Sequence, residues 1–438
     1  MAVRCLVWGC VVWCVGLAVE AADVDPKLQT AKAAFLSSFK KKPPERVLAT
    51  TALGEFPQKE VVDLLLKKGC LDAEPSVRFA ARQTLTKLAE DRAIRQSLFE
   101  DWKHGLRRPN THWADQLRAL AATADESQQA EIVEGLNTFL ATPNGDLRST
   151  IAVIDDYADQ GDEQALTAVK FMSRVNLFET KFAYRRTIVQ AAARIKSKGA
   201  IGLLIDALEK SHGLIQSDIV VALTRITGQK FRDKHEDWKK WWEMNEAPFV
   251  YPSMLGPKYN PNEPNAAYFY GMPICAKRVV LVLDTSNSMR GNPIEAAKKA
   301  LLATIESLPE AVNFDVIVFN REAVAWKNQL VPATREAKDE VSENITMCSL
   351  GLATASFKAL RTAFDLEPEA IYFLSDGQPT DGNPVQIVEA MSYANRIRRI
   401  SIYTVGVVTD RVNGGGNGLT RFMAPLSEQN WGEFLLVE

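Results

Sequence analysis

From residue 277 onward, short apolar segments alternate with amphipathic ones. The apolar segments predict strands at 278–284, 314–320, 369–376, 399–407 and 432–438, and 323–328 predicts an antiparallel edge strand. Between the strands, apolar residues recur at helical spacing, for example over 293–308. The segment "RVVLVLD" is apolar on both faces, as in a parallel sheet covered by helices on both sides. The alternation predicts a doubly wound, Rossmann-like α/β domain over 267–438.

Two of these strands end in side chains that carry ligand oxygens. The segment "VVLVLDTSNS" runs into Asp284, Ser286 and Ser288, and "IYFLSDG" ends at Asp376. Between them, Thr354 stands at the start of a predicted helix. Ligand sites in such sheets form beyond the carboxyl ends of the strands. Carboxylates and hydroxyls without His or Cys favour Mg²⁺, with Mn²⁺ or Ca²⁺ as alternatives, over Zn²⁺.

The spacing of the two serines suggests how the ion would be held. In an extended loop, the hydroxyls of Ser286 and Ser288 would face one point, because side chains two residues apart share a face. Neutral hydroxyl ligands would leave the ion under-neutralised if the carboxylates bind through water. Such an ion would stay electrophilic, and an open coordination position would accept an Asp or Glu carboxylate from a partner.

Taken together, these motifs resemble a von Willebrand factor type A domain with a metal-ion-dependent adhesion site. The segment "DTSNS" matches its D-x-S-x-S motif, "LATASFKAL" is similar to its threonine segment GGTxxxxAL, and "SDGQPTDG" matches its second aspartate motif. In that family the serines and the threonine commonly ligate the ion directly, and the aspartates often act through water. The resemblance assigns these roles to Ser286, Ser288, Thr354, Asp284 and Asp376.

The sequence departs from the family pattern in two places. Asn287 stands where a small glycine is more usual, and Leu352-Ala353 replaces Gly-Gly before Thr354. The second change predicts a stiffer loop with an altered affinity for the ion. A degenerate domain that holds no metal is the alternative to a working site.

Residues 23–247 form a different kind of pattern and predict helices throughout. The clearest segment, "PSVRFAARQTLTKLA", starts with a proline and places apolar residues at spacings of three and four. It resembles the second helix of a HEAT repeat, and short helix pairs that stack on their neighbours are typical of solenoids. We therefore expect an all-α HEAT-like solenoid. Residues 95–145 fit the repeat poorly, and an irregular helical bundle is the alternative.

The helical region is predicted to end at a cluster of tryptophans. Trp238, Trp241 and Trp242 fall on one helix face, which suits a cap that packs on the last repeat or on the next domain. An aromatic platform for a ligand is the alternative. Residues 248–266 follow as a proline-rich linker, since proline fixes φ and removes backbone donors.

The first residues resemble an export signal. An apolar run follows Arg4 and ends before the small residues Ala21 and Ala22, which predicts a signal peptide over 1–21. The expected location is therefore extracytoplasmic, either periplasmic or secreted, with an uncleaved N-terminal anchor as the alternative. No later segment is apolar enough to span a membrane. Cys70, Cys275 and Cys348 are expected to be small buried hydrophobes, and a Cys275–Cys348 disulfide is the alternative.

Composition and motifs limit the classes of function that the protein can have. A net charge of −2 argues against nucleic acid as a partner. The sequence contains no GxSxG, HExxH or GxxxxGK[ST] pattern, so we expect a non-enzymatic protein. The predicted function is Mg²⁺-dependent recognition of a protein partner that presents an Asp or Glu, with the oligomeric state left open. The alternatives are a scaffold that binds partners through its helical repeats and a metal-dependent hydrolase.

Overall fold

The computed structural model describes residues 25–107, 112–142, 145–161, 163–256, 266–408 and 417–437. The chain divides into two compact units, Met1–Leu98 and Phe99–Glu438. The predicted signal peptide (1–21) and residues 257–265 of the predicted linker lie outside the described residues. The domain boundaries expected at 23–247, 248–266 and 267–438 therefore stay predictions.

The first unit consists of short paired helices. It contains α1 (Pro26–Ser38), α2 (Pro43–Ala52), α3 (Lys59–Leu64), which continues into one π-helical turn, α4 (Pro75–Leu88) and the start of α5 (Arg92–Arg107). Three of these helices begin at a proline, whose fixed φ suits the first turn. α2 packs on α4, and a Cβ at Gly69 would lie only 2.8 Å from the Ala81 Cβ. This pairing is consistent with helical repeats.

The second unit begins with further helices. They are α6 (Trp113–Thr123), α7 (Glu126–Leu140), α8 (Leu147–Gln160), α9 (Glu163–Met172), α10 (Leu177–Thr180), α11 (Phe182–Arg194), α12 (Lys198–Glu209), α13 (Gly213–Thr227) and α14 (His235–Asn245). Trp238 and Trp242 of α14 are buried against apolar residues of α12 and α13. The Trp238 ring meets the Phe231 ring edge-on at 5.0 Å. The interpretation of the tryptophans as a packing cap is confirmed.

The rest of the second unit is built around a mostly parallel sheet. Its strands are β3 (Arg278–Asp284), β4 (Asn313–Phe319), β5 (Ala323–Ala325), β6 (Val331–Pro332), β7 (Ala370–Ser375), β8 (Ser401–Val407) and β9 (Phe434–Val437). The strand order is β5-β4-β3-β7-β8-β9, and β6 pairs with β4. β5 and β6 run antiparallel to β4, and the other pairs are parallel. The predicted α/β fold and its antiparallel edge strand are confirmed.

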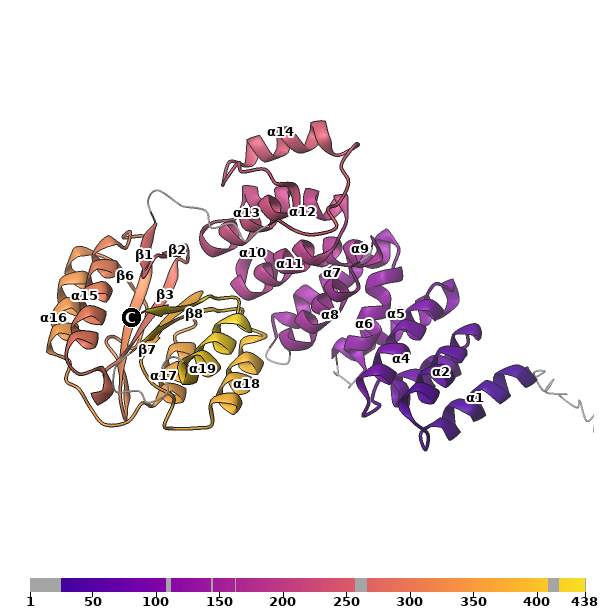
Figure 1. The fold of residues 1–438 in the computed structure, drawn as a ribbon. Helices are drawn as coiled ribbons and strands as arrows, with labels where there is room; N and C mark the ends of the chain where they lie inside the picture. The colour runs from indigo at the N-terminus through magenta and orange to yellow at the C-terminus, as the bar shows by residue number, and fades with distance from the viewer. Residues whose placement is uncertain are drawn as a thin grey trace, which may run out of the picture. The chain divides into compact units, whose positions relative to one another are not determined.

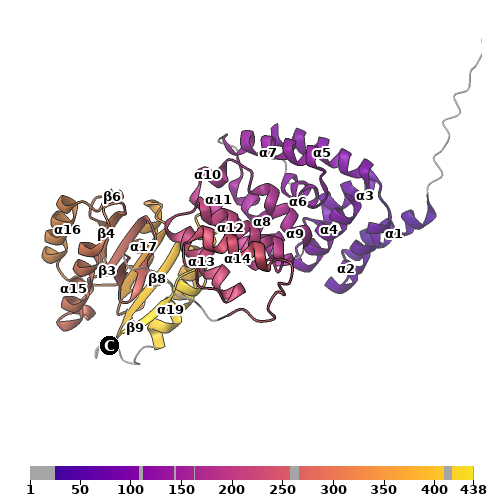
Figure 2. The ribbon, with the colours of Figure 1, turned by 90° about the horizontal axis from the view of Figure 1, so that it is seen from above.

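Helices cover both faces of this sheet. Val279, Leu281 and Leu283 of β3 face a core shared with α15 (Asn292–Ser307) and α16 (Arg335–Met347). The alternate residues of β3 face a second core shared with α17 (Ser356–Asp365), α18 (Pro384–Asn395) and α19 (Asn417–Glu428). Figures 1 and 2 show these two helical layers on opposite sides of the strands. A strand buried on both faces must be apolar throughout, as "VVLVL" is.

A small hairpin that was not predicted from the sequence precedes the sheet. β1 (Ala267–Phe269) and β2 (Met272–Ile274) are antiparallel and are joined by Tyr270 and Gly271, both at positive φ. The Phe269 ring packs edge-on against the Tyr372 ring, 6.0 Å away. The hairpin therefore closes one edge of the core on the α15 side.

Helices of the second unit contact the α/β domain at the amino end of β8. Arg186 of α11 is 1% exposed and donates to Asp218 of α13 at 2.7 Å. It also donates to the Ser401 hydroxyl at 2.9 Å and to the backbone oxygen of Arg399. Parallel strands carry their amino ends at one edge of the sheet, so this contact lies at the edge opposite to the one where Asp284 and Asp376 are found.

Two further expectations concern the membrane and the cysteines. Across the described ranges, no helix combines the length and the apolar character needed to cross a bilayer. Cys348 is a free thiol, so the Cys275–Cys348 disulfide is not formed. Cys70 is buried, as expected, whereas Cys275 and Cys348 are only partly buried, and the expectation of full burial was wrong for these two.

Candidate metal site

The candidate site forms where β3 and β7 end next to each other. Asp284 is the last residue of β3, and Asp376 directly follows the end of β7. The two strands are hydrogen-bonded neighbours in parallel register, with Leu283 opposite Leu374. Both aspartates are 0% exposed. The parallel register thus brings two carboxyl groups, 92 positions apart in the sequence, to one buried edge of the sheet.

Hydrogen bonds connect the two carboxyl groups through serine hydroxyls. Asp284 accepts from the Ser286 N–H at 2.7 Å and from the Ser375 hydroxyl at 2.5 Å. The Ser286 and Ser288 hydroxyl oxygens lie 2.9 Å apart, and the Ser288 hydroxyl donates to Asp376 at 2.8 Å. This chain of contacts fixes the positions of four oxygen-bearing side chains predicted from the sequence.

The loop that carries the serines differs from the expectation of an extended segment. Ser286 is extended, but residues Asn287–Met289 form a 3₁₀ turn. The two hydroxyls nevertheless meet, because the turn folds Ser288 back towards Ser286. Asn287, which replaces the usual glycine, is partly exposed and accepts from Arg290 at 3.3 Å.

Thr354 lies beside the end of β7, as the motif order predicted. It is 6% exposed, and a Cβ added to Gly377 would lie 3.6 Å from its hydroxyl oxygen. The backbone of Thr354 is held by Thr380, which accepts from the Thr354 N–H at 2.9 Å through its hydroxyl. The Thr380 N–H in turn donates to the backbone carbonyl oxygen of Thr354 at 2.9 Å. All five predicted site residues therefore gather at one edge of the sheet.

Several residues that position the site were missed at the sequence level. Thr380 holds Thr354, and Asp381 accepts from the Phe357 and Lys358 N–H groups at the start of α17. Thr380 and Asp381 both lie within the segment "SDGQPTDG", but only Asp376 of this segment was predicted as a site residue. Their roles depend on contacts with a loop about 25 residues away in the sequence, and no local pattern reports such contacts.

The loop before Thr354 is fastened to the end of β3. The Gly351 N–H donates to the Thr285 oxygen at 2.9 Å, and Ser286 pairs with Gly351 in an isolated parallel bridge. A Cβ at Gly351 would lie 2.5 Å from Asn320 Cγ, so any larger residue there would displace the Asn320 side chain. The Ala355 N–H then donates to the Asn320 oxygen at 2.7 Å. The loops after β3 and β4 thereby fix the position of Thr354 beyond the carboxyl ends of the strands.

Burial dominates the electrostatics of the site. The pKa of Asp284 is raised to about 7, chiefly by burial; the hydrogen bonds from Ser375 and Ser286 lower this pKa, and the charge of Asp376 raises it. Within the described ranges, none of these leading influences comes from a cationic side chain. Two buried carboxyl groups and three hydroxyls thus make up the donor set, which fits a hard divalent cation.

The donor set also separates this site from transition-metal centres. Across the parts of the chain that the structure describes, no group of three or more His, Cys, Asp or Glu residues could hold a metal. A site made largely of hydroxyls contributes little negative charge of its own, in contrast to a carboxylate cage. The assignment of Asp284, Ser286, Ser288, Thr354 and Asp376 as ligands stays a prediction.

Comparison with known proteins identifies this part of the chain. Residues 277–412 match the family model for the von Willebrand factor type A domain. The chain is 30% identical over 158 residues to von Willebrand factor A domain-containing protein 3B of Homo sapiens, over 36% of this chain and 11% of that protein. It is 29% identical over 145 residues to inter-alpha-trypsin inhibitor heavy chain H1 of Mesocricetus auratus, over 30% and 16% of the two chains.

Among solved structures, a von Willebrand factor type A protein from Catenulispora acidiphila is similar, with 18% identity and a TM-score of 0.33. That match covers 38% of this chain and 40% of the other. The chain spans only between about a tenth and a sixth of the length of the two curated relatives. Residues 277–412 form a von Willebrand factor type A domain, and the resemblance noted in the sequence is confirmed for this part of the chain.

The backbone before Thr354 supports a first prediction. Ala353 is exposed and has a φ of +71°, a conformation that costs an L residue about 1–2 kcal/mol. Ala353→Gly should remove this strain and raise the free energy of unfolding by about 0.5–1 kcal/mol, after allowance for the extra chain entropy of glycine. Ala303→Gly, at an exposed position inside α15, should instead lower it by about 1 kcal/mol. Urea unfolding measures both changes, and an equal loss in both variants would contradict the strain argument.

The raised pKa of Asp284 predicts how the cation-free protein responds to pH. The folded state retains the Asp284 proton up to about pH 7, whereas the unfolded chain loses it near the ordinary value of 3.8. The stability that this proton provides is complete below about pH 4 and is lost as the pH rises through 7, by a few kcal/mol in total.

Urea unfolding in EDTA between about pH 5 and 8 tests this prediction. The wild-type protein should lose stability relative to Asp284→Asn across this range, because asparagine keeps the shape of the side chain and does not titrate. A difference between the two proteins that does not change with pH would show that burial does not perturb this carboxyl group.

Proposed function

We propose that the chain recognises a protein partner in a Mg²⁺-dependent way, through a metal-ion-dependent adhesion site that binds a carboxylate of the partner. The observation that carries the proposal is the hydrogen-bonded row Ser286–Ser288–Asp376, which lies beside buried Asp284 at the sheet edge. Von Willebrand factor type A domains mediate protein–protein interactions and commonly bind divalent metals at this position. Mn²⁺ and Ca²⁺ are alternative ions for the same donors.

The roles of the residues follow from their chemistry. Ser286, Ser288 and Thr354 would bind the ion directly through their hydroxyl oxygens, and Asp284 and Asp376 would balance its charge through water. When bound, the ion supplies an electrophilic position for an incoming carboxylate. The protein contributes preorganisation, since the hydroxyls already face the buried carboxyl groups and little ordering remains to be done on binding.

Burial of the carboxyl groups favours recognition over hydrolysis. Both oxygens of Asp284 already accept hydrogen bonds, from the Ser286 N–H and the Ser375 hydroxyl, and the side chain is 0% exposed. Asp376 is equally buried and accepts from Ser288. A general base or a nucleophile must come within reach of its substrate, either directly or, for a base, through one water. We therefore propose that the protein is not an enzyme.

The proposal includes export to an extracytoplasmic location. Its support is the apolar run after Arg4 and the small residues Ala21-Ala22, which are typical of a cleaved signal peptide. The exported protein is expected to begin close to Ala22. N-terminal sequencing of protein from the extracytoplasmic fraction checks this, and an exported chain that still starts at Met1 would favour an uncleaved anchor.

Binding of the ion is tested by thermal unfolding of the full chain. Mg²⁺ should raise the melting temperature relative to EDTA, since a ligand at about one hundred times its Kd adds about 2.7 kcal/mol of stability. Thr354→Ala removes one hydroxyl and should reduce the shift at a given Mg²⁺ concentration. Thr354→Ser keeps the hydroxyl and is the matched control, so it should respond like the wild-type protein.

Recognition itself is tested by selecting a random displayed peptide library on the full chain. In Mg²⁺ the selection should enrich peptides that contain Asp or Glu, and this enrichment should disappear in EDTA and with Thr354→Ala. Peptides that bind equally well in EDTA would not be using the proposed site. If every enriched peptide behaved in that way, the scaffold alternative would replace the adhesion proposal.

A further inference from the structure

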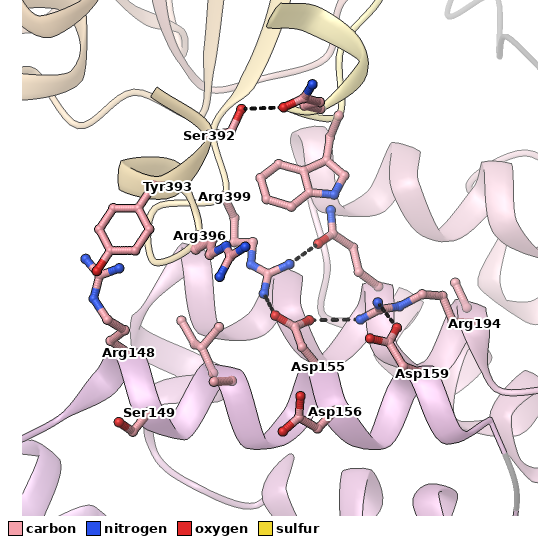
Figure 3. A pocket seen from close by; sticks show the side chains of 16 residues that line it. Arg148, Ser149, Asp155, Asp156, Asp159, Arg194, Ser392, Tyr393, Arg396 and Arg399 are labelled. Carbon is pink, nitrogen blue, oxygen red and sulfur yellow. Dashed lines mark hydrogen bonds and ion pairs between the residues drawn. The ribbon is translucent and has the colours of Figure 1, made fainter. Parts of the chain in front are cut away.

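A second candidate site lies at the other end of the sheet, within the second unit. A cavity of about 970 Å³ is lined on one side by α8 and α11, including Arg148, Asp155 and Arg194. Its other side is formed by α18 and by the segments that lead into β8 and β9, including Tyr393 and Arg399. Figure 3 shows these side chains facing one another across the cavity. We refer to this cavity as the interdomain groove.

The acidic residues of the interdomain groove are already paired with arginines. Asp155 accepts from Arg194 at 2.8 Å and also from Arg399, and Asp159 accepts from Arg194 at 2.8 Å. Asp156 pairs with Arg118. Asp155, Asp156 and Asp159 therefore each pair with an arginine, although Arg118 is shared with Asp115, 2.5 Å away.

Two other arginines of the groove have no such partner. Arg148 and Arg396 form no ion pair within the described ranges. The Arg148 guanidinium lies 4.6 Å from the centre of the exposed Tyr393 ring. Arg396 follows Tyr393 by three residues, at the end of α18, and is exposed. Figure 3 shows Arg148 beside Tyr393 at one end of the groove and Arg396 farther in, next to Arg399, so these two arginines add positive charge to this half of the groove.

Unsatisfied donors mark the same cavity. Arg399 is 4% exposed, and its Nε–H group has no hydrogen-bond partner in the described structure, although its other nitrogens bind Asp155 and Gln190. The buried Nη1 of Arg148 likewise has no partner there. Buried N–H groups are nearly always paired in native proteins, so water or a bound ligand is expected to supply the acceptor for both groups.

We propose that the interdomain groove binds an acidic peptide segment of a protein partner, with its carboxylates on Arg148 and Arg396. Arginine presents a planar fork of N–H groups that matches a carboxylate. From Arg148 to Asp159 the groove follows α8 for about 16 Å, at 1.5 Å per residue. This length fits an extended segment of about five residues at roughly 3.3 Å each.

The composition of the groove favours a peptide over a polyphosphate. Asp156 and Asp159 lie at the far end, with 38% and 70% of their side-chain surface accessible. The same carboxylates suit a backbone N–H or a basic side chain of a peptide. Ser149 and the Ser392–Gln429 pair add further polar groups for a peptide backbone.

This site is independent of the proposed adhesion site. Arg399 lies just before β8 and Trp431 just before β9, so the groove is at the amino ends of strands whose carboxyl ends point towards the metal-site edge. Its positive groups are arginines, which need no ion. Peptide binding here should therefore persist in EDTA, where recognition through a divalent cation is lost.

The test uses the full chain in EDTA and a fluorescein-labelled peptide, Glu-Glu-Ala-Glu-Glu, followed by fluorescence anisotropy. The wild-type protein should bind this peptide and should not bind the matched peptide Gln-Gln-Ala-Gln-Gln. Arg148→Gln and Arg396→Gln should each weaken binding about tenfold, the usual loss for one charge-assisted hydrogen bond. Arg421→Gln, at an exposed position of α19 outside the groove, is the matched control and should bind like the wild-type protein.

Each other outcome would overturn the proposal. Absence of binding by the wild-type protein, or equal binding by wild type and both groove variants, would exclude the groove as the site. Displacement of the labelled peptide by millimolar inorganic phosphate would assign the groove to a small anion instead. Thermal unfolding of Arg396→Gln verifies that the variant is folded, as expected for an exposed side chain. A failed Mg²⁺ response of the adhesion site would leave these results unchanged.

Discussion

The site depends above all on the burial of one carboxyl group, that of Asp284, at the end of a strand covered on both faces. A buried carboxylate without a cation is expensive, and the protein reduces this cost with hydrogen bonds from the Ser286 N–H and the Ser375 hydroxyl. Those two bonds fix the loop after β3 and the end of β7 in one place. The positions of Ser288 and Asp376 then follow, because they are adjacent to residues that are already held.

The sheet, and the meeting of the five candidate residues at one end of it, could be predicted from the sequence for identifiable physical reasons. A strand buried on both faces must be apolar, so β3 and β7 stand out, and parallel strands bring their carboxyl ends to one edge. The hairpin β1–β2 was missed because its strands have three residues each and its turn, Tyr270-Gly271, is not a common hairpin dipeptide. The roles of Thr380 and Asn320 were not predicted, because both residues hold the loop around Thr354 through contacts that form only in the folded protein.

The junction between the helices and the α/β domain could not be predicted for the same reason. Arg186 lies in an ordinary amphipathic helix, and its contacts with Arg399 and Ser401 span more than 200 positions. A guanidinium that is 1% exposed depends on its partners, because removing one of them leaves a buried charge. Asp218, the Ser401 hydroxyl and the Arg399 backbone oxygen together accept four hydrogen bonds from Arg186. The junction therefore tolerates little change in the way these helices meet β8.

This arrangement places constraints on any partner. The helices contact the amino ends of the strands, so the carboxyl edge with Asp284, Ser286 and Thr354 is left to the loops of the α/β domain. β8 is seven residues long, which separates the two edges by about 20 Å. One short peptide cannot bridge that distance and also fill the interdomain groove. A partner that engages both sites must present two separate segments, and each segment would then raise the effective concentration of the other.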